Sequence, residues 1–289
     1  PVPPCVRVQL GSQLHHFQET VAGQGTSSLA SLSTMAPSAV LAPALALLAA
    51  VLLASHADAA KIPDYIPLCK RDVPDFDKCL LNTVEAVRPH LAKGIPKLKV
   101  PALEPLTIPA LEINRNNEAL QVKAKLKDIQ AFGGTGFVVN KLKTDIDKLA
   151  VDVSVTIPKL HVTADYDVDG RLLVIPLKGK GIFEGNFTNS KADVKATGKL
   201  IKSKKGVQYV QVKDLSVRLT VGGQKVKFIN KGNRDTEAIT KTVMNFYNQN
   251  RQQVLEIVMP IVEETVVAFM RQFANSILRS VPFSEILPK

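Results

Sequence analysis

The stretch VDVSVTIPKLHVTADYDVDG, residues 151–170, contains two runs in which apolar and polar side chains alternate one by one. The first run has valine at 151, 153 and 155, and the second has an apolar residue at every second position from Leu160 to Val168. A period of two is typical of antiparallel strands with one dry and one wet face. We therefore predict two strands here, the second of which ends in a turn at Asp169-Gly170.

The same period continues on both sides, from residue 98 to about residue 228. Glycine-rich or lysine-rich breaks at Lys204-Lys205-Gly206 and Gly222-Gly223 separate the later runs. Several runs are long, which favours a strongly curved sheet over a compact sandwich. The further strands predicted after the turn cover residues 173–187, 192–201, 207–221 and 225–229.

Helical spacing precedes and follows this β region. Residues 75–92 have apolar side chains three and four apart, with Asp72 or Asp75 as candidate N-cap and Gly94 as candidate C-cap. No glycine occurs from Asp235 to Ser280, where apolar residues again recur at helical spacing. About 45 residues of helix would span about 70 Å, so we expect Pro260 to kink or divide it.

The apolar stripe of the C-terminal helix is broad, so this helix needs to be wrapped rather than touched on one side. The concave dry face of a curved sheet is the surface that can do this. We predict one large α+β domain, with a short N-terminal helix and a long C-terminal helix wrapped by a highly curved antiparallel β-sheet.

The first part of the chain has the features of a targeting segment. After Met35 comes an uncharged apolar run, residues 40–54, and then the small-residue pattern Ala57-x-Ala59. A membrane helix needs about 20 apolar residues, so this run is short, although it also lacks a preceding positive charge. We predict a signal peptide at 35–59, an upstream leader at 1–34 that is not part of the fold, and a single ligand-binding domain at 60–289. The alternative for the apolar run is a buried or membrane-anchoring helix.

The chain is basic, with a net charge of +11. Residues 1–59 hold one base and two acids, so residues 60–289 carry +12. The lysines are spread along the alternating strands, where a solvated outer face explains them, and we predict no nucleic-acid partner. Only the Lys202-Ser203-Lys204-Lys205 turn concentrates charge, and by itself it is too short to indicate a partner.

Two of the three cysteines, Cys69 and Cys79, lie outside the predicted leader. In an exported chain a disulfide is their natural pairing, and closing so small a loop contributes about 2–3 kcal/mol. A zinc site would need two more ligands, and the remaining histidines, His90 and His161, are far apart in sequence. We therefore predict no metal site and no cofactor. Asn186-Phe187-Thr188 is a glycosylation sequon in a turn-like context.

No pattern for catalysis is present. The chain has no Gly-x-Ser-x-Gly motif, and the adjacent Glu263 and Glu264 would diverge by about 100° on a helix, so they cannot act as an acid–base couple. The glycine-rich segment 132–136 is followed by β-like residues and is interpreted as a hairpin turn rather than a phosphate loop. The sequence does not indicate an enzyme.

Several motifs, in order and spacing, resemble the insect juvenile hormone-binding and takeout proteins. The resemblance covers residues 61–289. The motifs are Ile66-Pro-Leu-Cys69, Cys79-Leu-Leu-Asn-Thr-Val84, Ile157-Pro-Lys-Leu160, Ala164-Asp-Tyr-Asp-Val-Asp-Gly170, Gly179-Lys-Gly-Ile-Phe-Glu-Gly-Asn-Phe187, Phe246-Tyr-Asn-Gln-Asn250, Met259-Pro260 and Val281-Pro282.

The resemblance implies a tubular lipid-binding fold of the super-roll type with an elongated internal cavity. It also implies a secreted, extracellular carrier of an apolar small molecule, such as a terpenoid hormone or a fatty acid, in hormone, circadian or feeding signalling. Hormone-specific members often have a second disulfide, which this chain cannot form, so the takeout branch is favoured. The partners expected are the apolar ligand and a receptor or membrane contact. The alternative is a cationic membrane-surface protein that extracts or transfers lipid.

The ligand-binding residues are predicted from the helix faces that should point into the sheet. For each of them, simple core packing is the alternative. A tyrosine is of special interest because its phenol can hydrogen-bond a ligand while its ring packs. The predicted residues are Leu80, Val84 and Val87 from the first helix, Tyr166 from the sheet, and Val243, Phe246, Tyr247, Val254, Val258 and Phe269 from the last helix.

Overall fold

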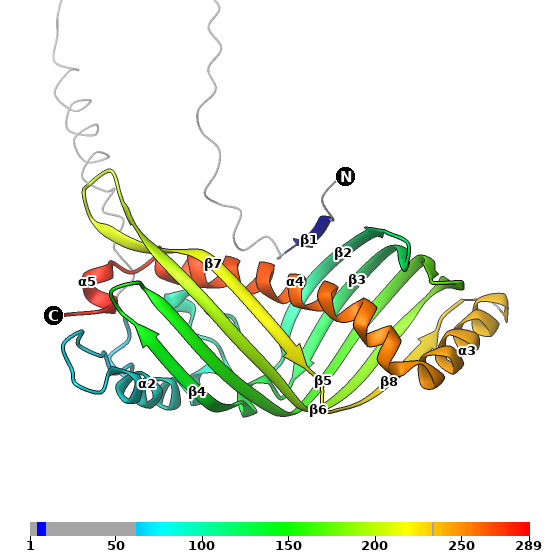
Figure 1. Cartoon of the computed structure of the whole chain (residues 1–289), viewed down its shortest axis with the longest axis horizontal. Coiled ribbons are helices and arrows are strands. Elements are labelled where there is room, and N and C mark those ends of the chain that lie inside the picture. Colours follow the sequence, from blue (N-terminus) through cyan, green and yellow to red (C-terminus); the bar gives the residue numbers. More distant parts are fainter. Residues whose placement is uncertain (1–4, 10–61, 233) are drawn as a thin grey trace, which may run out of the picture. The chain divides into compact units, whose positions relative to one another are not determined.

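A computed structural model describes residues 5–9, 62–232 and 234–289 (Figure 1). From residue 62 onward a helix comes first, then an antiparallel sheet, then C-terminal helices, which confirms the predicted order for this part of the chain. The helices are α2 (Phe76–Leu91), α3 (Arg234–Gln249), α4 (Arg251–Leu278) and the short α5 (Phe283–Ile286). No helix among these residues is both long and apolar enough to cross a membrane.

The described strands form one antiparallel sheet in the order β1-β2-β3-β5-β6-β7, with β4 paired to β5 and β8 paired to β6. Two very long strands, β5 and β6, run through all of it as a hairpin with an unbroken register. The bounds are β1 (Cys5–Gln9), β2 (Leu106–Asn116), β3 (Leu120–Phe132), β4 (Val138–Asp145), β5 (Ala150–Leu172), β6 (Ile175–Lys202), β7 (Gln208–Thr220) and β8 (Gly223–Asn230).

The turn predicted at Asp169-Gly170 is wrong. Strand β5 continues to Leu172, and the chain turns at Leu173 and Val174. Gly170 is needed for close approach rather than for a turn, because a Cβ there would lie 2.1 Å from the carbonyl oxygen of Gln121 on β3.

A line of interruptions crosses the sheet, and we call it the crease. Strand β3 stops and β4 starts on opposite sides of it, and β7 and β8 do the same on the other flank. Between these, β6 contains a residue with φ of 50° at Asn189. In β5 the crease falls at Pro158, which has no N–H to donate. The crease comprises residues 133–137, 158, 189 and 221–222.

The inward-facing positions change parity at the crease. Before Asn189 the buried residues of β6 are odd-numbered, such as Gly181 and Gly185, whereas after it Val194 is buried and Lys195 is exposed. In β5 the apolar residues are odd before Pro158 and even after it. A left-handed residue interrupts strict alternation, so each half of the sheet keeps its own dry face. The α3 half contains β2, β3, β8 and residues 160–172 and 175–188; the α2 half contains β4, β7 and residues 150–157 and 190–202.

The C-terminal helical region divides at Asn250 and not at Pro260 as predicted. Asn250 lies between α3 and α4, and its side-chain amide donates to the carbonyl of Phe246 at 3.0 Å. A side chain that hydrogen-bonds to nearby backbone competes with the helix, so asparagine is suited to such a junction. Pro260 is accommodated inside α4.

Strand β1 was not predicted. Residues Cys5–Gln9 pair with the outer edge of β2, from Cys5 opposite Asn114 to Gln9 opposite Ala110. This differs from the expectation that residues 1–34 have no part in the fold. The pairing is possible because an unpaired strand edge exposes backbone N–H and C=O groups that can bond to an added strand. The rest of the predicted leader and the signal peptide at 35–59 lie outside the described residues.

Candidate functional site

Helix α4 contacts β7 and β1, the two ends of the strand order β1-β2-β3-β5-β6-β7 (Figure 1, orange). Along β7, the N–H of Val212 donates to Asn275 Oδ1 at 2.9 Å and the N–H of Leu219 donates to Glu263 Oε1 at 2.8 Å. On the opposite edge, Arg115 of β2 forms an ion pair with Glu264 of α4. The helix therefore closes the curled sheet, and the two adjacent glutamates reach different edges.

The first turns of α4 are anchored to the inner face of the α3 half. Their Val254 and Ile261 form a buried cluster with three residues of β3 and β5. Partly buried residues of α3 and α4, including four predicted ligand-binding residues, pack around this cluster. The buried members from the sheet are Leu120, Val122 and Leu172, and the four predicted residues are Phe246, Tyr247, Val254 and Val258.

Most apolar side chains of α4 are only partly buried. Among its 28 residues only Val254 and Ile261 are buried, and Val262 is 38% exposed. Val266, Phe269 and Met270 are all half-buried, although the helix lies along a concave apolar sheet. Apolar surface left in contact with water is unfavourable by about 25 cal/mol per Å². The interior therefore offers apolar side chains that a ligand can cover.

Tyr166 lies inside the sheet, but its phenol already has a partner. The side chain is 7% exposed and packs edge-on against Phe228, with ring centroids 5.4 Å apart. Burial raises the pKa of Tyr166, and a hydrogen bond with Thr240 of α3 partly opposes this. Phe183 packs on the same Phe228 ring at 5.3 Å. The alternating pattern of β6 and β8 could have indicated Phe183 and Phe228, which sequence analysis missed.

Tyr247 is the second tyrosine with an internal partner. Burial raises its pKa, while the charge of Arg251 and a hydrogen bond with Gln224 lower it. The Arg251 guanidinium lies 5.8 Å from the centroid of the ring. The end of the interior next to α3 therefore has one buried phenol, Tyr166, and one partly buried phenol, Tyr247, each of which could exchange its protein partner for a polar group of a ligand.

The remaining predicted residues are not part of the cluster around Val254 and Ile261. Val87 of α2 packs on a separate cluster made by Ile95, Leu98 and Val281. Phe269 packs at a tilt against Phe273 of α4 itself, with ring centroids 4.4 Å apart. Leu80, Val84 and Val243 are half-buried.

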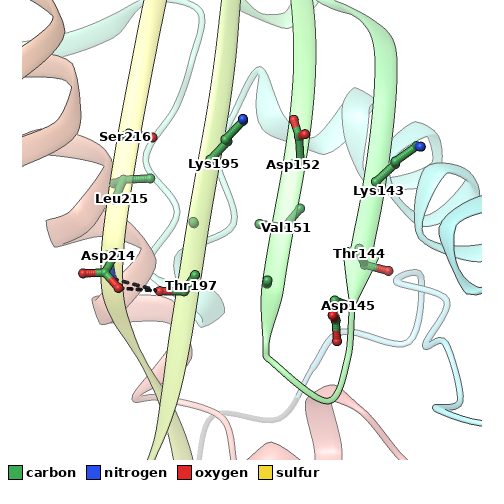
Figure 2. A pocket seen from close by; sticks show the side chains of 12 residues that line it. Lys143, Thr144, Asp145, Val151, Asp152, Lys195, Thr197, Asp214, Leu215 and Ser216 are labelled. Carbon is green, nitrogen blue, oxygen red and sulfur yellow. Dashed lines mark hydrogen bonds between the residues drawn. The ribbon is translucent and has the colours of Figure 1, made fainter.

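Two pockets lie between rows of strand residues and contain none of the ten predicted side chains. Figure 2 shows the first, of about 440 Å³, which crosses β4, β5, β6 and β7. Val151, Ala196 and Leu215 line it together with charged residues such as Lys143 and Asp152. The second, of about 530 Å³, is lined mainly by charged and polar residues of β2, β3 and β5. The atoms that line both pockets are nonetheless mainly apolar, so the charged residues in their linings do not by themselves exclude an apolar ligand.

The glycine-rich segment 132–136 is not a hairpin, because it joins β3 to β4, which both pair with β5. Its amides are occupied: Glu104 accepts from the N–H groups of Gly133 at 2.8 Å and Thr135 at 2.9 Å. Desolvation raises the pKa of Glu104, but these bonds outweigh it, so the pKa lies below its ordinary value. The Glu104 carboxylate therefore occupies the backbone N–H groups that a phosphate loop would offer to its ligand.

The predicted disulfide is present. Cys69 and Cys79 are bonded with their Cα atoms 5.9 Å apart, and the bond ties the segment before α2 to that helix. Among the described residues, no three or more His, Cys, Asp or Glu side chains are placed to hold a metal ion.

Asn186 does not lie in the predicted turn. It is exposed in the middle of β6, opposite His161 of β5, whose Nδ1 is 2.9 Å from Asn186 Oδ1. Its exposure is compatible with glycosylation, which remains a prediction.

Comparison with known proteins gives consistent results. Residues 46–288 match the family described as haemolymph juvenile hormone binding protein. Circadian clock-controlled protein daywake of Drosophila yakuba is 24% identical over 216 residues, 72% of this chain and 83% of that protein. A putative beta-carotene-binding protein of Schistocerca gregaria is 25% identical over 151 residues, 52% of this chain and 59% of that protein.

Among solved structures, Takeout 1 of Epiphyas postvittana has the same fold. It matches with a TM-score of 0.61 and 22% identity, over 77% of this chain and 99% of that one. The curled sheet with a C-terminal helix and a short N-terminal helix is therefore confirmed as a takeout fold.

Proposed function

The chain belongs to the haemolymph juvenile hormone-binding protein family, and on this basis we propose that it is a secreted carrier of an apolar small molecule. The ligand would lie between α4 and the concave sheet, where it would cover the partly exposed apolar side chains of the helix. This exposed surface is the observation that supports the proposal most directly. The ligand class is a terpenoid, a fatty acid or another extended lipid.

The names of two relatives agree with this proposal. One is described as a putative beta-carotene-binding protein, which names a long apolar ligand, and the other as a circadian clock-controlled protein. A role in circadian or feeding signalling is therefore part of the proposal. Catalysis is not, since this family consists of binding proteins.

The direct test is to identify what the protein carries. The purified chain is extracted with organic solvent and the extract is analysed by mass spectrometry, and the emptied protein is then titrated with fatty acids, terpenoids and carotenoids. We expect one class of apolar compound at about one molecule per chain. An empty extract together with no binding across the panel would overturn the carrier function.

A pair of variants tests where in the protein the ligand binds. Val258→Trp adds bulk beside the cluster on the inner side of α4, whereas Gln253→Trp adds the same group on its exposed side. Filling the interior should weaken ligand binding by about tenfold or more, because an overpacked apolar site has no room for the ligand. Equal affinities for the two variants, both checked for folding by circular dichroism, would place the ligand elsewhere.

A further inference from the structure

The hairpin between β6 and β7 carries unbalanced positive charge. Residues 199–213 include five lysines and no acidic residue. Lys213 lies 3.9 Å from Asp214, but Lys199, Lys202, Lys204 and Lys205 form no ion pair with any carboxylate of the described residues. All four are exposed. The hairpin tip therefore presents a cationic surface that the chain itself does not neutralise.

Several lysines on the outer face of the α3 half, by contrast, lie within ion-pair distance of a carboxylate. Lys180 is 2.9 Å from Asp167, Lys231 is 3.1 Å from Asp165, and Lys125 is 3.4 Å from Glu112. The positive charge of the chain is thus not spread evenly, although its lysines are. Lys123, Lys225 and Lys227 of the α3 half are also exposed without an ion pair among the described residues, but only the β6–β7 hairpin brings four such lysines together within seven residues, 199–205.

Apolar side chains are exposed within the same hairpin. Leu200, near the end of β6, is 43% exposed, and Val207, immediately before β7, is 38% exposed. In Figure 1 this hairpin extends past α5, so no other described element covers its tip. Isolated exposed apolar residues are ordinary, but two beside four unpaired lysines form the combination that an anionic lipid surface binds.

We propose that the β6–β7 hairpin docks the protein on anionic lipid bilayers. The lysines would meet the charged headgroups, and Leu200 and Val207 would enter the boundary between headgroups and acyl chains. A soluble polyanion would complement the lysines equally well, but it would leave the two apolar side chains without a function. This docking does not depend on which ligand the interior holds.

Vesicle flotation of the whole chain tests the docking. We expect binding to phosphatidylcholine vesicles that contain about 30% phosphatidylserine, which gives the bilayer a negative surface potential, and little binding to phosphatidylcholine alone. Binding should fall steeply between about 0.05 and 0.5 M salt, because the Debye length shortens from above 10 Å to below 8 Å. Absence of binding to the anionic vesicles at low salt would overturn the proposal.

Matched variants locate the contact. Each lysine near an anionic surface strengthens binding about fivefold, so Lys202→Gln, Lys204→Gln and Lys205→Gln together should weaken it by about a hundredfold. The control changes three other exposed lysines without ion pairs among the described residues, Lys123, Lys225 and Lys227, also to Gln. The control should stay within about threefold of the parent, since charges beyond a Debye length contribute little. Equal losses in the two variants would show a response to net charge and overturn the assignment.

Insertion of the hairpin into the bilayer can be followed by the fluorescence of a single introduced tryptophan, because the chain has no tryptophan of its own. Val207→Trp should shift its fluorescence to the blue on anionic vesicles, and brominated lipid should quench it. Val174→Trp, at the β5–β6 turn where Val174 is 86% exposed, is the control and should not change. Heparin binding that depends on the same lysines, without a blue shift on vesicles, would identify a polyanion site and overturn bilayer docking. Ligand uptake is measured without vesicles, so its failure is distinguishable from failure of docking.

Discussion

The two halves of the sheet on either side of the crease differ in what their side chains do. The α3 half contains the buried clusters that include strand residues, with Leu120 and Val122 against α4 and Leu111 and Ile129 beside them. Several of its outer lysines are paired with carboxylates. The α2 half has small inward side chains such as Ala192 and Ala196, and it contains the β6–β7 hairpin with its four unpaired lysines. Stability thus comes mainly from one half, which leaves the other freer to meet partners.

Truncation of core leucines should produce the largest difference between the halves. Leu120→Ala in the α3 half should lower the free energy of unfolding by about 3 kcal/mol, because a 5% exposed leucine leaves a cavity. Leu215→Ala on β7, where the side chain is half-buried, should lower it by about 1 kcal/mol. Urea unfolding followed by circular dichroism measures both. Equal losses would contradict the assignment of stability to the α3 half.

Mutation of the two polar contacts between α4 and the sheet should have the next largest effect on the free energy of unfolding. Arg115→Met should lower the free energy of unfolding by about 1–2 kcal/mol, since Glu264 loses its partner but is half-exposed and can be solvated. Glu263→Gln on the other edge should cost less than about 0.5 kcal/mol, because the amide oxygen can still accept from Leu219. The same urea titrations give both values, and a larger loss for Glu263→Gln would reverse the order.

The loop at the crease should show a pH dependence. The pKa of Glu104 is lower in the folded chain than its ordinary value near 4.5, so its contribution to stability is present above that value and is lost as the pH falls below it. Glu104→Gln should lower the free energy of unfolding by about 1 kcal/mol at pH 7 and by less at pH 3. Thermal unfolding of both proteins at the two pH values tests this, and a pH-independent difference would assign the effect to packing.

The outer charge pairs of the α3 half should matter least for stability. Lys180→Gln removes the pair with Asp167, whose side chain is half-exposed, and should change the free energy of unfolding by less than about 0.5 kcal/mol. In our comparison these pairs neutralise the surface rather than hold the fold. The variant should therefore increase binding to cationic vesicles slightly without a change in the urea midpoint.

Much of the fold could be predicted because alternation and helical spacing are local properties. The runs at 151–157 and 160–168 indicated strands, and the broad apolar stripe after Asp235 indicated a helix that needs wrapping. The errors came from residues with two structural uses. Gly170 was interpreted as a turn residue, but it lets β3 approach β5, and Asn250 rather than Pro260 divides the last helices.

The candidate site was harder to predict, because it depends on which elements meet. Phe246, Tyr247, Val254 and Val258 share one cluster since they follow one another along α3 and α4. Val87 belongs to a different cluster, with Val281 nearly 200 residues away, which no local pattern reveals. Phe183 and Phe228 become neighbours of Tyr166 only through the register of β6 with β5 and β8.

The crease also bears on how such a protein can diverge. In an ordinary strand a one-residue deletion inverts every side chain beyond it and exposes the core. Here Asn189 already resets the alternation, and β3/β4 and β7/β8 are separate segments on its flanks. Insertions at the crease would not invert the side chains beyond it, because the alternation is already interrupted there. The residues that line one half could therefore change to suit a new ligand while the packing of the other half stays the same.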